Sequence, residues 1–521
     1  MAAGNSPNHP PRPGSGFSPG AAGALLAICA LLWGLAWATQ GSASAWPRFE
    51  DDAYYYLAIA RNAAAGHGFT ADGLSPTNGF QPLWMWLLVP VAWLLGGATG
   101  PLLWTVHAVV VAIFAATGGL LYGLLRPRFG AGPAAAGTAL LFWPPFANVL
   151  LSGMESGLAA CLAVALVREL LDGGVLEPRD ARPGDLRTGV LLGLVLLARL
   201  DSVFIAVGLA GYLAVREAVA HGPARAVRKG LLVFWPVIAL LAPYLAWNQL
   251  AFGHLVPISG VLKTNLAAPG FTPWNLTPSY WGVLALVAAA LAAPEPLRAG
   301  ARVRPVFGAL AVGLGLQSLH TMVFMHWAVF GWHFALFIPV GALAAAAVAH
   351  AARARMPAGA ARALGAACAA ALVVAQGFSL SRLPLQFMAA SGEAGRWVAA
   401  NLPPDARLGM KDSGAFGFFS ERSVVNLDGV VNSFAYQEAL CRGELAGFLR
   451  EHRVSYVCQH AVPPEVRSGS YTAFVQRYPC HLPGGGGSEL ELRRDGEVYR
   501  GPPYHNYFGV EDRVVIWRVP P

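Results

Sequence analysis

Charged residues are scarce in this chain of 521 residues: only 12% are Asp, Glu, Lys or Arg, whereas 55% are hydrophobic. Soluble domains carry roughly 25% charged residues, so this composition excludes an ordinary soluble protein. Cysteine is scarce too. The six cysteines form neither a CxxC pair nor a Cys/His pattern with metal-ligand spacing. The sequence therefore gives no indication of a cysteine-based metal site.

Apolar sequence is abundant. The mean hydropathy is +0.48, and many apolar runs approach the roughly 20 residues that span a bilayer. The 60 glycines and 39 prolines fit packed or broken membrane helices, in which these residues are tolerated. The formal net charge of +8 is explained by the topology signals described below, and no nucleic-acid partner is expected. We predict a polytopic α-helical membrane protein.

The N-terminal part divides into a tail and a first membrane segment. Residues 1–20, rich in Pro, Gly, Ser and Asn, are predicted to be a disordered cytoplasmic tail, and residues 21–39 form an apolar helix. Residues 43–45 (Ala-Ser-Ala) resemble a signal-peptidase site, but the long apolar run favours an uncleaved anchor. Further apolar runs occupy residues 81–97, 102–125, 133–151, 157–171, 188–200, 203–215, 231–248, 281–293, 306–324, 333–349 and 363–380.

Arginine and lysine indicate the topology, because cytoplasmic loops are enriched in them. If residues 81–97 lie along the outer surface or re-enter, almost all basic residues of the membrane domain fall inside; if they cross, nearly all fall outside. We therefore predict a juxtamembrane or re-entrant helix there and about eleven crossings elsewhere. The membrane domain is residues 21–381, with its first outer loop at 40–101. The N-terminus lies inside.

Residues 382–521 contain no spanning run and are predicted to form a small soluble α/β domain on the extracytoplasmic side. Cys441, Cys458 and Cys480 would then lie in an oxidising compartment. One disulfide is expected, and the sequence leaves its pairing open. Short strands and helices are predicted to alternate at residues 393–401, 407–410, 423–427, 442–450, 454–458 and 514–519.

Three carboxylates, Glu50, Asp51 and Asp52, follow the first apolar segment and precede the tyrosines Tyr54–Tyr56. Carboxylates are costly near a bilayer, so a cluster at its edge indicates a functional site. A plainer alternative is a solvated helix start whose acidic residues interact with the helix dipole. The tyrosines would then belong to an interfacial aromatic belt.

Other polar groups of the membrane domain collect on the same outer side in this topology, which indicates a cavity. Each has a structural alternative, such as an Arg199–Asp201 pair, a helix-positioning role for Glu155, or a Lys263 that snorkels to the interface. The residues in question are Asn78 of the first outer loop, Glu155 of a GMES segment, Arg199 and Asp201 of an ARLD segment, and His254 and Lys263 of the segment Phe252–Asn265.

Together these residues resemble the GT-C superfamily of polytopic glycosyltransferases. More narrowly, they are similar to its bacterial branch related to protein mannosyltransferases and lipid A aminoarabinose transferases. The resemblance spans nearly the whole chain. The chain departs from the family pattern at Glu50-Asp51-Asp52, where relatives often have Asp-Glu or Asp-X-Asp, and at Gln81, where His or Lys is expected. The matching segments are Asp51-Asp52, Ala53–Trp84, GMES, ARLD, GHLVPISGVLK and the NLDGVVNS stretch Asn426–Ser433.

This resemblance implies a transferase that moves a sugar from a polyprenyl phosphate donor to a glycan, lipid or protein acceptor of the cell envelope, working on the outer side of a bacterial inner membrane. Asp51 or Asp52 would act as the general base, or the two would hold a divalent cation such as Mg²⁺ or Mn²⁺. Direct displacement predicts inversion at the anomeric carbon. Candidates for binding the donor phosphate or substrate are Lys263, Arg199, His254, Glu155, Asp201, Tyr55 and Asn78.

Two other classes remain open from the sequence. A transporter or flippase of a glycolipid would use intramembrane charges and broken helices as its path. Against it, the chain has no obvious inverted repeat, and transport needs no dedicated C-terminal domain. A non-catalytic scaffold would bind a glycolipid without turning it over.

Overall fold

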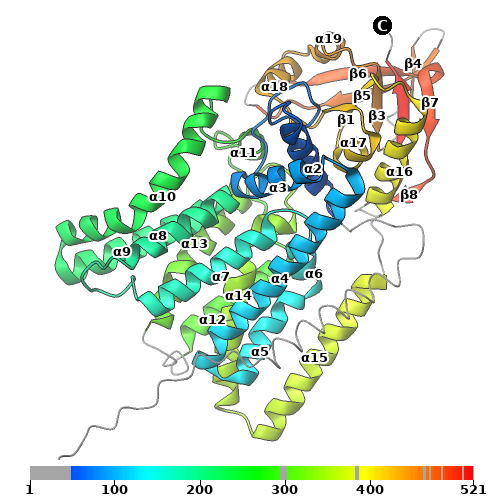
Figure 1. The fold of residues 1–521 in the computed structure, drawn as a ribbon. Coiled ribbons are helices and arrows are strands. Elements are labelled where there is room, and N and C mark those ends of the chain that lie inside the picture. Colours follow the sequence, from blue (N-terminus) through cyan, green and yellow to red (C-terminus); the bar gives the residue numbers. More distant parts are fainter. Residues whose placement is uncertain are drawn as a thin grey trace, which may run out of the picture.

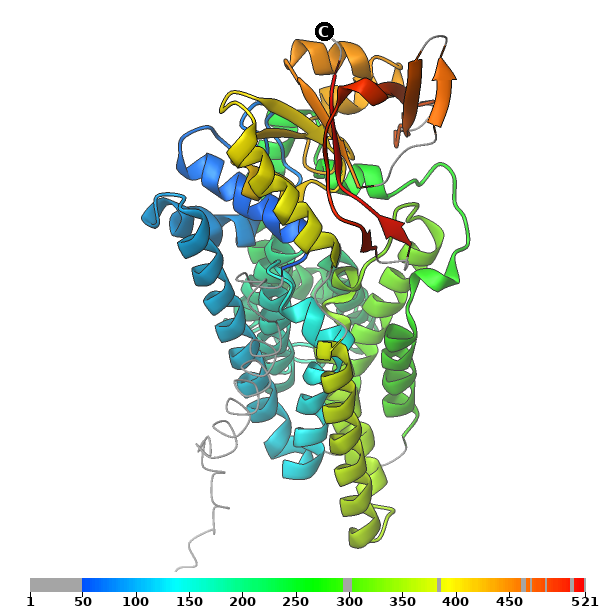
Figure 2. The ribbon, with the colours of Figure 1, turned by 90° about the vertical axis from the view of Figure 1, so that its right-hand side faces the viewer.

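The computed structural model describes residues 49–293, 302–381, 386–460, 465–468, 471–482, 485–506 and 510–519. The predicted tail and first apolar helix lie outside these residues. A bundle of long helices carries a smaller region of strands and helices at one end (Figures 1 and 2). We call that end of the bundle the domain end, the opposite one the far end, and the smaller region the C-terminal region.

The bundle is almost entirely helical. Its elements are α2 (Asp51–Ala64), α3 (Pro82–Leu94), α4 (Thr99–Phe129), α5 (Ala131–Ala139), η1 (Leu140–Phe142), α6 (Pro144–Leu150), α7 (Ser156–Gly173), α8 (Asp185–Ala198), η2 (Leu200–Ser202), α9 (Val203–His221), α10 (Pro223–Phe252), α11 (Ile258–Lys263), η3 (Pro273–Asn275), α12 (Pro278–Ala292), α13 (Val303–Val323), η5 (Gly331–Phe334), α14 (Phe337–Arg353) and α15 (Ala358–Ser381). The predicted run 133–151 is split into α5, η1 and α6, because Pro144 and Pro145 lack the N–H groups that would continue the helix.

Five segments among the described residues are long and apolar enough to cross a membrane: 99–129, 200–221, 223–252, 303–323 and 359–379. Four further apolar helices are shorter, namely 82–94, 131–142, 278–292 and 337–353. A polytopic membrane protein agrees with these findings, while the expected count of about eleven crossings stays a prediction.

Ion pairs show which helix ends share the far end of the bundle. They join the end of α4 to the end of α7, the start of α8 to the loop before it, and α9 to α10. The loop before α13 joins the same group. The pairs are Arg128–Asp172, Arg179–Asp185, Glu217–Lys229 and Arg302–Glu177.

The helix predicted at residues 81–97 has both of its ends at the domain end. Before α3, the backbone N–H of Gln81 donates to the hydroxyl of Tyr56 on α2 (3.0 Å). Shortly after α3, the hydroxyl of Thr99 donates to Glu421 of the C-terminal region (3.4 Å). Figure 1 places α3 beside α2, next to the C-terminal region. This geometry is the one expected of a juxtamembrane helix.

The C-terminal region is α/β, as predicted. Its main sheet has the strand order β2-β1-β3-β10-β7; β1 is parallel to β2 and β3, whereas β10 is antiparallel to β3 and β7. The elements are α16 (Gln386–Asn401), β1 (Arg407–Met410), α17 (Gly414–Ser420), β2 (Ser423–Asn426), α18 (Phe434–Cys441), α19 (Leu445–Glu451), β3 (Tyr456–Gln459), β4 (Glu465–Ser468), β5 (Tyr471–Tyr478), β6 (Ser488–Arg493), η6 (Arg494–Gly496), β7 (Glu497–Arg500), β8 (Tyr504–His505), β9 (Glu511–Asp512) and β10 (Val515–Arg518).

Both faces of the main sheet are buried, which explains the apolar character of its strands. On one face Val457 and Trp517 pack in a cluster with residues of α18 and α19. On the other face Cys458 and Ile516 pack in a cluster with residues of α16. Adjacent residues of one strand thus serve opposite cores, as the alternation of side chains along a strand requires.

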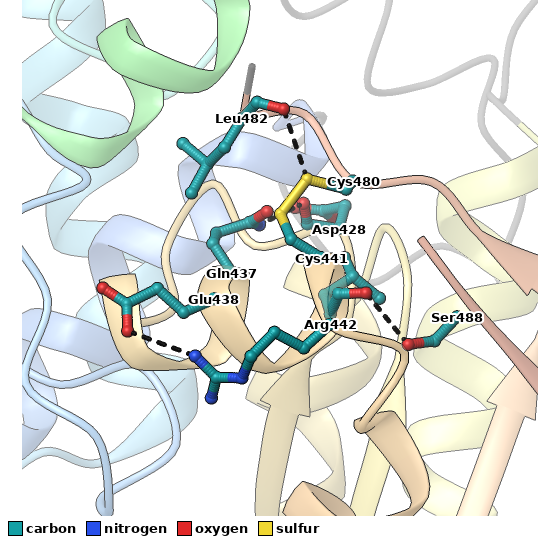
Figure 3. Close-up of a disulfide and its surroundings, with 9 residues drawn as sticks. Asp428, Gln437, Glu438, Cys441, Arg442, Cys480, Leu482 and Ser488 are labelled. Atoms are coloured by element: carbon teal, nitrogen blue, oxygen red, sulfur yellow. Dashed lines mark hydrogen bonds and ion pairs between the residues drawn. A yellow bond between two sulfur atoms is a disulfide. The ribbon is translucent and has the colours of Figure 1, made fainter. Parts of the chain in front are cut away.

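A disulfide joins Cys441, at the end of α18, to Cys480, which follows β5 (Figure 3). This settles the pairing that the sequence left open, and Cys458 remains a buried free thiol. The bridge fixes the segment after β5, where the ring of His481 lies 4.4 Å from the ring of Trp327 in the bundle. The disulfide therefore anchors a contact between the two parts of the molecule.

Helix α2 belongs to one hydrophobic core with both parts of the molecule. Tyr54 of α2 packs against Phe418 and Phe419 of α17, with ring centroids 5.7 and 5.6 Å away. At Gly414 the approach is so close that a Cβ atom would lie 2.0 Å from the backbone oxygen of Asp51. Since close-packed cores tolerate no such overlap, the position requires glycine.

Candidate functional site

A cavity of about 830 Å³ lies between α2, the bundle and the C-terminal region. Asp52, Tyr55, Tyr56 and Ile59 line it from α2. Their spacing of three and four residues places them on one face of the helix. Of the three carboxylates Glu50, Asp51 and Asp52, only Asp52 therefore lies on the face of α2 that borders the cavity.

Asp51 lies outside this stripe and does not line the cavity. Its carboxylate oxygens accept hydrogen bonds from the backbone N–H groups of Gly414 (2.9 Å) and Ala415 (2.8 Å), at the start of α17. Burial raises the pKa of Asp51 to about 8, although these two hydrogen bonds oppose the rise. Asp51 thus caps α17 and ties the C-terminal region to α2.

Asp52 is the carboxylate that faces the cavity. Within the described part of the chain, its side chain makes no hydrogen bond or ion pair. Burial raises the pKa of Asp52; the positive charge of Lys263 opposes this rise, and the negative charge of Asp428 adds to it. An unengaged carboxylate with a raised pKa is a stronger base than an ordinary aspartate and can take up a proton from a hydroxyl group.

Lys263 brings the opposite charge to the same cavity. It is the last residue of α11 and lines the cavity. Its ammonium group has no hydrogen-bond or ion-pair partner among the residues that the structure describes. The segment is held in place by backbone contacts, since the N–H of His326 donates to the carbonyl of Lys263 (3.2 Å). Lys263 is therefore a free cation available to an anionic ligand.

Arg199, in contrast, is fully engaged. Its guanidinium forms a bidentate pair with Asp201 (3.0 and 2.7 Å) and an ion pair with Glu155. Arg199 and Glu155 are almost completely buried, and all three residues line the cavity. Two carboxylates around one guanidinium leave a net charge of −1. This group therefore favours a hydrogen-bond donor or a cation over a phosphate.

One wall of the cavity is apolar. It is formed by side chains from α8, η2, α9, α10 and the segment around α11, and it offers little but van der Waals contact to a ligand. The residues are Leu196, Leu200, Val203, Phe204, Leu241, Leu245, Leu255, Val256, Val261 and Leu266. A long hydrocarbon chain fits such a wall, because burying each CH₂ group contributes about 0.8 kcal/mol.

Tyr55 links the cavity to the C-terminal region. Its hydroxyl accepts hydrogen bonds from the N–H of Ser413 (2.7 Å) and from the side chain of Asn426 (2.9 Å), and it donates to Asp428 (3.4 Å). Asn426 and Asp428 belong to the NLDGVVNS stretch, which also supplies Val430 to the cavity wall. The C-terminal region thus contributes both to the wall and to the position of α2.

The structure brings together six of the predicted site residues around the cavity: Asp52, Tyr55, Glu155, Arg199, Asp201 and Lys263. It does not bring Asn78 or His254 there. The buried side chain of Asn78 accepts from the N–H of Ile258 (3.0 Å) and donates to Asn248 (3.2 Å), so it positions α11. The ring of His254 stacks on Phe434, 4.0 Å away.

The cavity also includes Gln317, which sequence reasoning missed, and Tyr56, His333 and Val430, which were not among the predicted site residues. Gln317 lies in the middle of the apolar helix α13. A polar side chain within such a run is itself a functional signal. This signal could have identified Gln317 from the sequence. Burial lowers the pKa of His333 well below its usual range, and the charges of Lys263 and Arg199 add to this effect.

A divalent cation held by Asp51 and Asp52 was one of two alternatives left open by the sequence, and the geometry does not favour that shared site. Both oxygens of Asp51 accept hydrogen bonds from backbone N–H groups, whereas Asp52 faces the cavity. Over the described residues, there is no group of three or more His, Cys, Asp or Glu side chains placed to hold a metal ion. A cation requirement stays a prediction.

The fold is shared with GT-C glycosyltransferases of known structure. The oligosaccharyltransferase of Archaeoglobus fulgidus in its apo form matches with a TM-score of 0.53 at 14% identity, covering 86% of this chain and 70% of that one. Its complex with an inhibitory peptide and a dolichol-phosphate gives a TM-score of 0.52 at 13% identity, covering 85% and 70%. ArnT of Cupriavidus metallidurans bound to undecaprenyl phosphate gives 0.51 at 14% identity, covering 85% and 93%.

Sequence comparison adds less. A domain of unknown function (DUF8728) matches residues 383–494, which is most of the C-terminal region. No curated protein matches the chain by sequence. The likeness to these solved structures shows that the chain shares their fold, which agrees with the resemblance found in the sequence.

Proposed function

We propose that the chain is a glycosyltransferase that moves a sugar from a polyprenyl phosphate donor to a hydroxyl group of a cell-envelope acceptor. The observation that carries this proposal is the pair Asp52 and Lys263. A free carboxylate and a free ammonium group border one cavity whose other wall is apolar. Base, phosphate ligand and lipid-binding wall are the three parts that such a transfer needs.

The roles follow from the charges. The prenyl chain lies along the apolar wall, and Lys263 binds the phosphate and stabilises the charge that develops on it as the bond to the anomeric carbon breaks. Asp52 takes the proton of the acceptor hydroxyl while that oxygen forms the new bond to the anomeric carbon. Polyprenyl phosphate leaves with the bonding electrons. A single displacement of this kind inverts the configuration at that carbon.

The assignment of Asp52 rather than Asp51 as the base rests on their partners. Asp51 gives both oxygens to the backbone of α17, whereas Asp52 has no hydrogen-bond or ion-pair partner among the residues that the structure describes. The sequence left this choice open. Asp51 serves the reaction only through the position of α2, which makes it a positioning residue.

The orientation in the membrane is part of the proposal. The C-terminal region and the cavity lie on the extracytoplasmic side of a bacterial inner membrane, with residues 382–521 as the outer domain. The arginines and lysines paired at the far end support this orientation. So does the position of both ends of α3 at the domain end.

The test is transfer of radiolabelled sugar from a panel of polyprenyl phosphate sugars, with purified full-length protein and crude envelope acceptors. We expect transfer from one class of donor, and a product whose anomeric configuration, read by NMR, is opposite to that of the donor. Retained configuration would contradict the single displacement. Donor binding without transfer to any acceptor would favour a scaffold or a transporter instead.

A further inference from the structure

Two buried oxygen acceptors in the cavity have no hydrogen-bond donor within the described residues. They are Oε2 of Glu155 and Oε1 of Gln317, whose residues are 1% and 3% exposed. Both residues line the cavity. Buried polar groups are nearly always hydrogen-bonded, and leaving one unsatisfied costs about 1–3 kcal/mol. Two such atoms in one cavity indicate a ligand that supplies the missing donors.

The orientation of Gln317 is fixed by its other end. Its Nε2 donates a hydrogen bond of 2.6 Å to the carbonyl of His333. A carbonyl can only accept, so the amide nitrogen must face it and the amide oxygen must face elsewhere. Oε1 is therefore a buried acceptor without a donor among the described residues, and a flipped amide would place two acceptors against each other.

The orientation of Glu155 is fixed in the same way. Its Oε1 is held by the guanidinium of Arg199, and Oε2 is a buried acceptor on the same cavity-lining residue. The hydroxyl of Tyr56 interacts with this carboxylate and opposes the rise in its pKa that burial causes, but among the described residues no donor meets strict hydrogen-bond geometry at Oε2.

Charge narrows the kind of ligand. Glu155 and Asp201 flank the single guanidinium of Arg199, so the group carries a net charge of −1. An anionic substituent placed here would be repelled, whereas hydroxyl or amino groups would satisfy the free acceptors. Lys263 remains the one cavity cation, among the described residues, that has no carboxylate partner.

We infer that Glu155 and Gln317 form a sugar subsite that accepts a ring with at least two hydroxyl or amino donors and no carboxylate at that end. This inference rests on the proposed function, because it assumes that the phosphate of the same donor lies at Lys263. It adds a selectivity: neutral or amino sugars are bound, and uronic acids are rejected.

The test measures dissociation constants for the full-length protein in nanodiscs, by microscale thermophoresis. The probes are a polyprenyl phosphate hexose, its amino-sugar and uronic-acid counterparts, and bare polyprenyl phosphate. We expect the hexose or the amino sugar to bind the wild type at least tenfold more tightly than the uronic acid does. Tighter binding of the hexose identifies hydroxyl groups as the hydrogen-bond donors to the subsite, and tighter binding of the amino sugar identifies an amino group. Equal or tighter binding of the uronic acid would overturn the inference.

The variant Gln317→Leu removes this acceptor, together with the donor to the carbonyl of His333, at nearly constant volume. It should weaken the hexose probe roughly tenfold and leave bare polyprenyl phosphate within about twofold of wild type. The matched control is Ser318→Ala on the same helix, whose hydroxyl donates to the carbonyl of Leu314 inside the bundle. Equal weakening of both probes would show that Gln317 only supports the fold, and no weakening would remove it from the subsite.

Failure of this inference and failure of the proposed function give different results. Binding contrasts without sugar transfer would keep the subsite and reject the transferase. Transfer without any contrast between neutral and acidic sugars would keep the transferase and reject the subsite. A deoxy-hexose probe on the wild type supplies a readout that depends on no variant, and it should bind roughly tenfold more weakly than the hexose when the missing hydroxyl is one that these acceptors bind.

Discussion

Both ends of the bundle bury charged side chains, yet they use them differently. At the far end Glu217 and Lys229 are 0% and 1% exposed and pair directly with each other. The same carboxylate also pairs with His221 (3.1 Å). At the domain end Asp52 and Lys263 border one cavity without forming an ion pair.

The difference lies in where the two charges meet. Charges in direct contact satisfy each other and hold helices together, so they leave nothing for a ligand. Charges held apart across a cavity stay available, and only a rigid surrounding fold can keep them so. The Arg199 group combines both situations, because its guanidinium is satisfied while one oxygen of Glu155 is not.

Breaking the far-end pair should have the largest effect on stability. Lys229→Met leaves the buried carboxylate of Glu217 without its main partner, which costs about 3–5 kcal/mol. Sugar transfer per folded molecule should stay unchanged. Thermal unfolding in detergent, with transfer measured on the folded fraction, checks both statements. The double variant with Glu217→Leu should recover most of the lost stability. Failure to recover it would mean that Glu217 or Lys229 also stabilises the fold through contacts with other residues.

Removing the disulfide should have the next largest effect, and it should be local. Cys441→Ser with Cys480→Ser releases the segment after β5 and should cost the C-terminal region about 3 kcal/mol. Hydrogen exchange should rise at residues 475–482 and at the Trp327 segment that contacts His481. The control is Cys368→Ser, which replaces an exposed free thiol. Unchanged exchange at Trp327 would show that the disulfide does not anchor this contact.

Neutralising Lys263 should act on affinity rather than on stability. Lys263→Met removes the free cation, and the affinity for bare polyprenyl phosphate should fall roughly thirtyfold, as expected for a hydrogen bond to a charged group. Lys263→Arg should restore most of it, because both side chains bind phosphate. The melting temperature should hardly move. A drop in stability with unchanged affinity would show that Lys263 stabilises the fold and does not bind the phosphate.

The pH dependence of transfer should show a smaller, graded effect. The base must be ionised, and the pKa of Asp52 is raised by burial and by Asp428. The rate should therefore increase with pH through a pKa above the usual range of aspartate, and then level off. Rates under single-turnover conditions from pH 4 to 9 check this. A rate that falls over this range would contradict a carboxylate base.

The sequence was sufficient for the features that depend on local pattern. Apolar runs predicted the helices. The balance of arginine predicted a juxtamembrane helix at residues 81–97; both ends of α3 lie at the domain end, and its place relative to the membrane stays a prediction. Strand β1 has the predicted bounds, Arg407–Met410. The charged residues Asp52 and Lys263 were found because charge is conspicuous in an apolar chain.

Long-range contacts account for what the sequence did not reveal. The role of Asp51 depends on N–H groups 363 and 364 residues away, and nothing in the acidic motif points to them. The role of Asn78 depends on Asn248 and Ile258 in the same way. Strands β4 to β6, which form a small sheet of their own, were also missed.

The most direct test compares Asp51→Asn with Asp52→Asn in single-turnover sugar transfer from the best donor. A positioned base contributes about 10²–10⁴-fold, so Asp52→Asn should lose that much while its donor affinity is kept. Asp51→Asn should retain most of the rate and lose stability instead. The reverse result, a collapse in Asp51→Asn with Asp52→Asn near the wild-type rate, would contradict the assignment of Asp52 as the base.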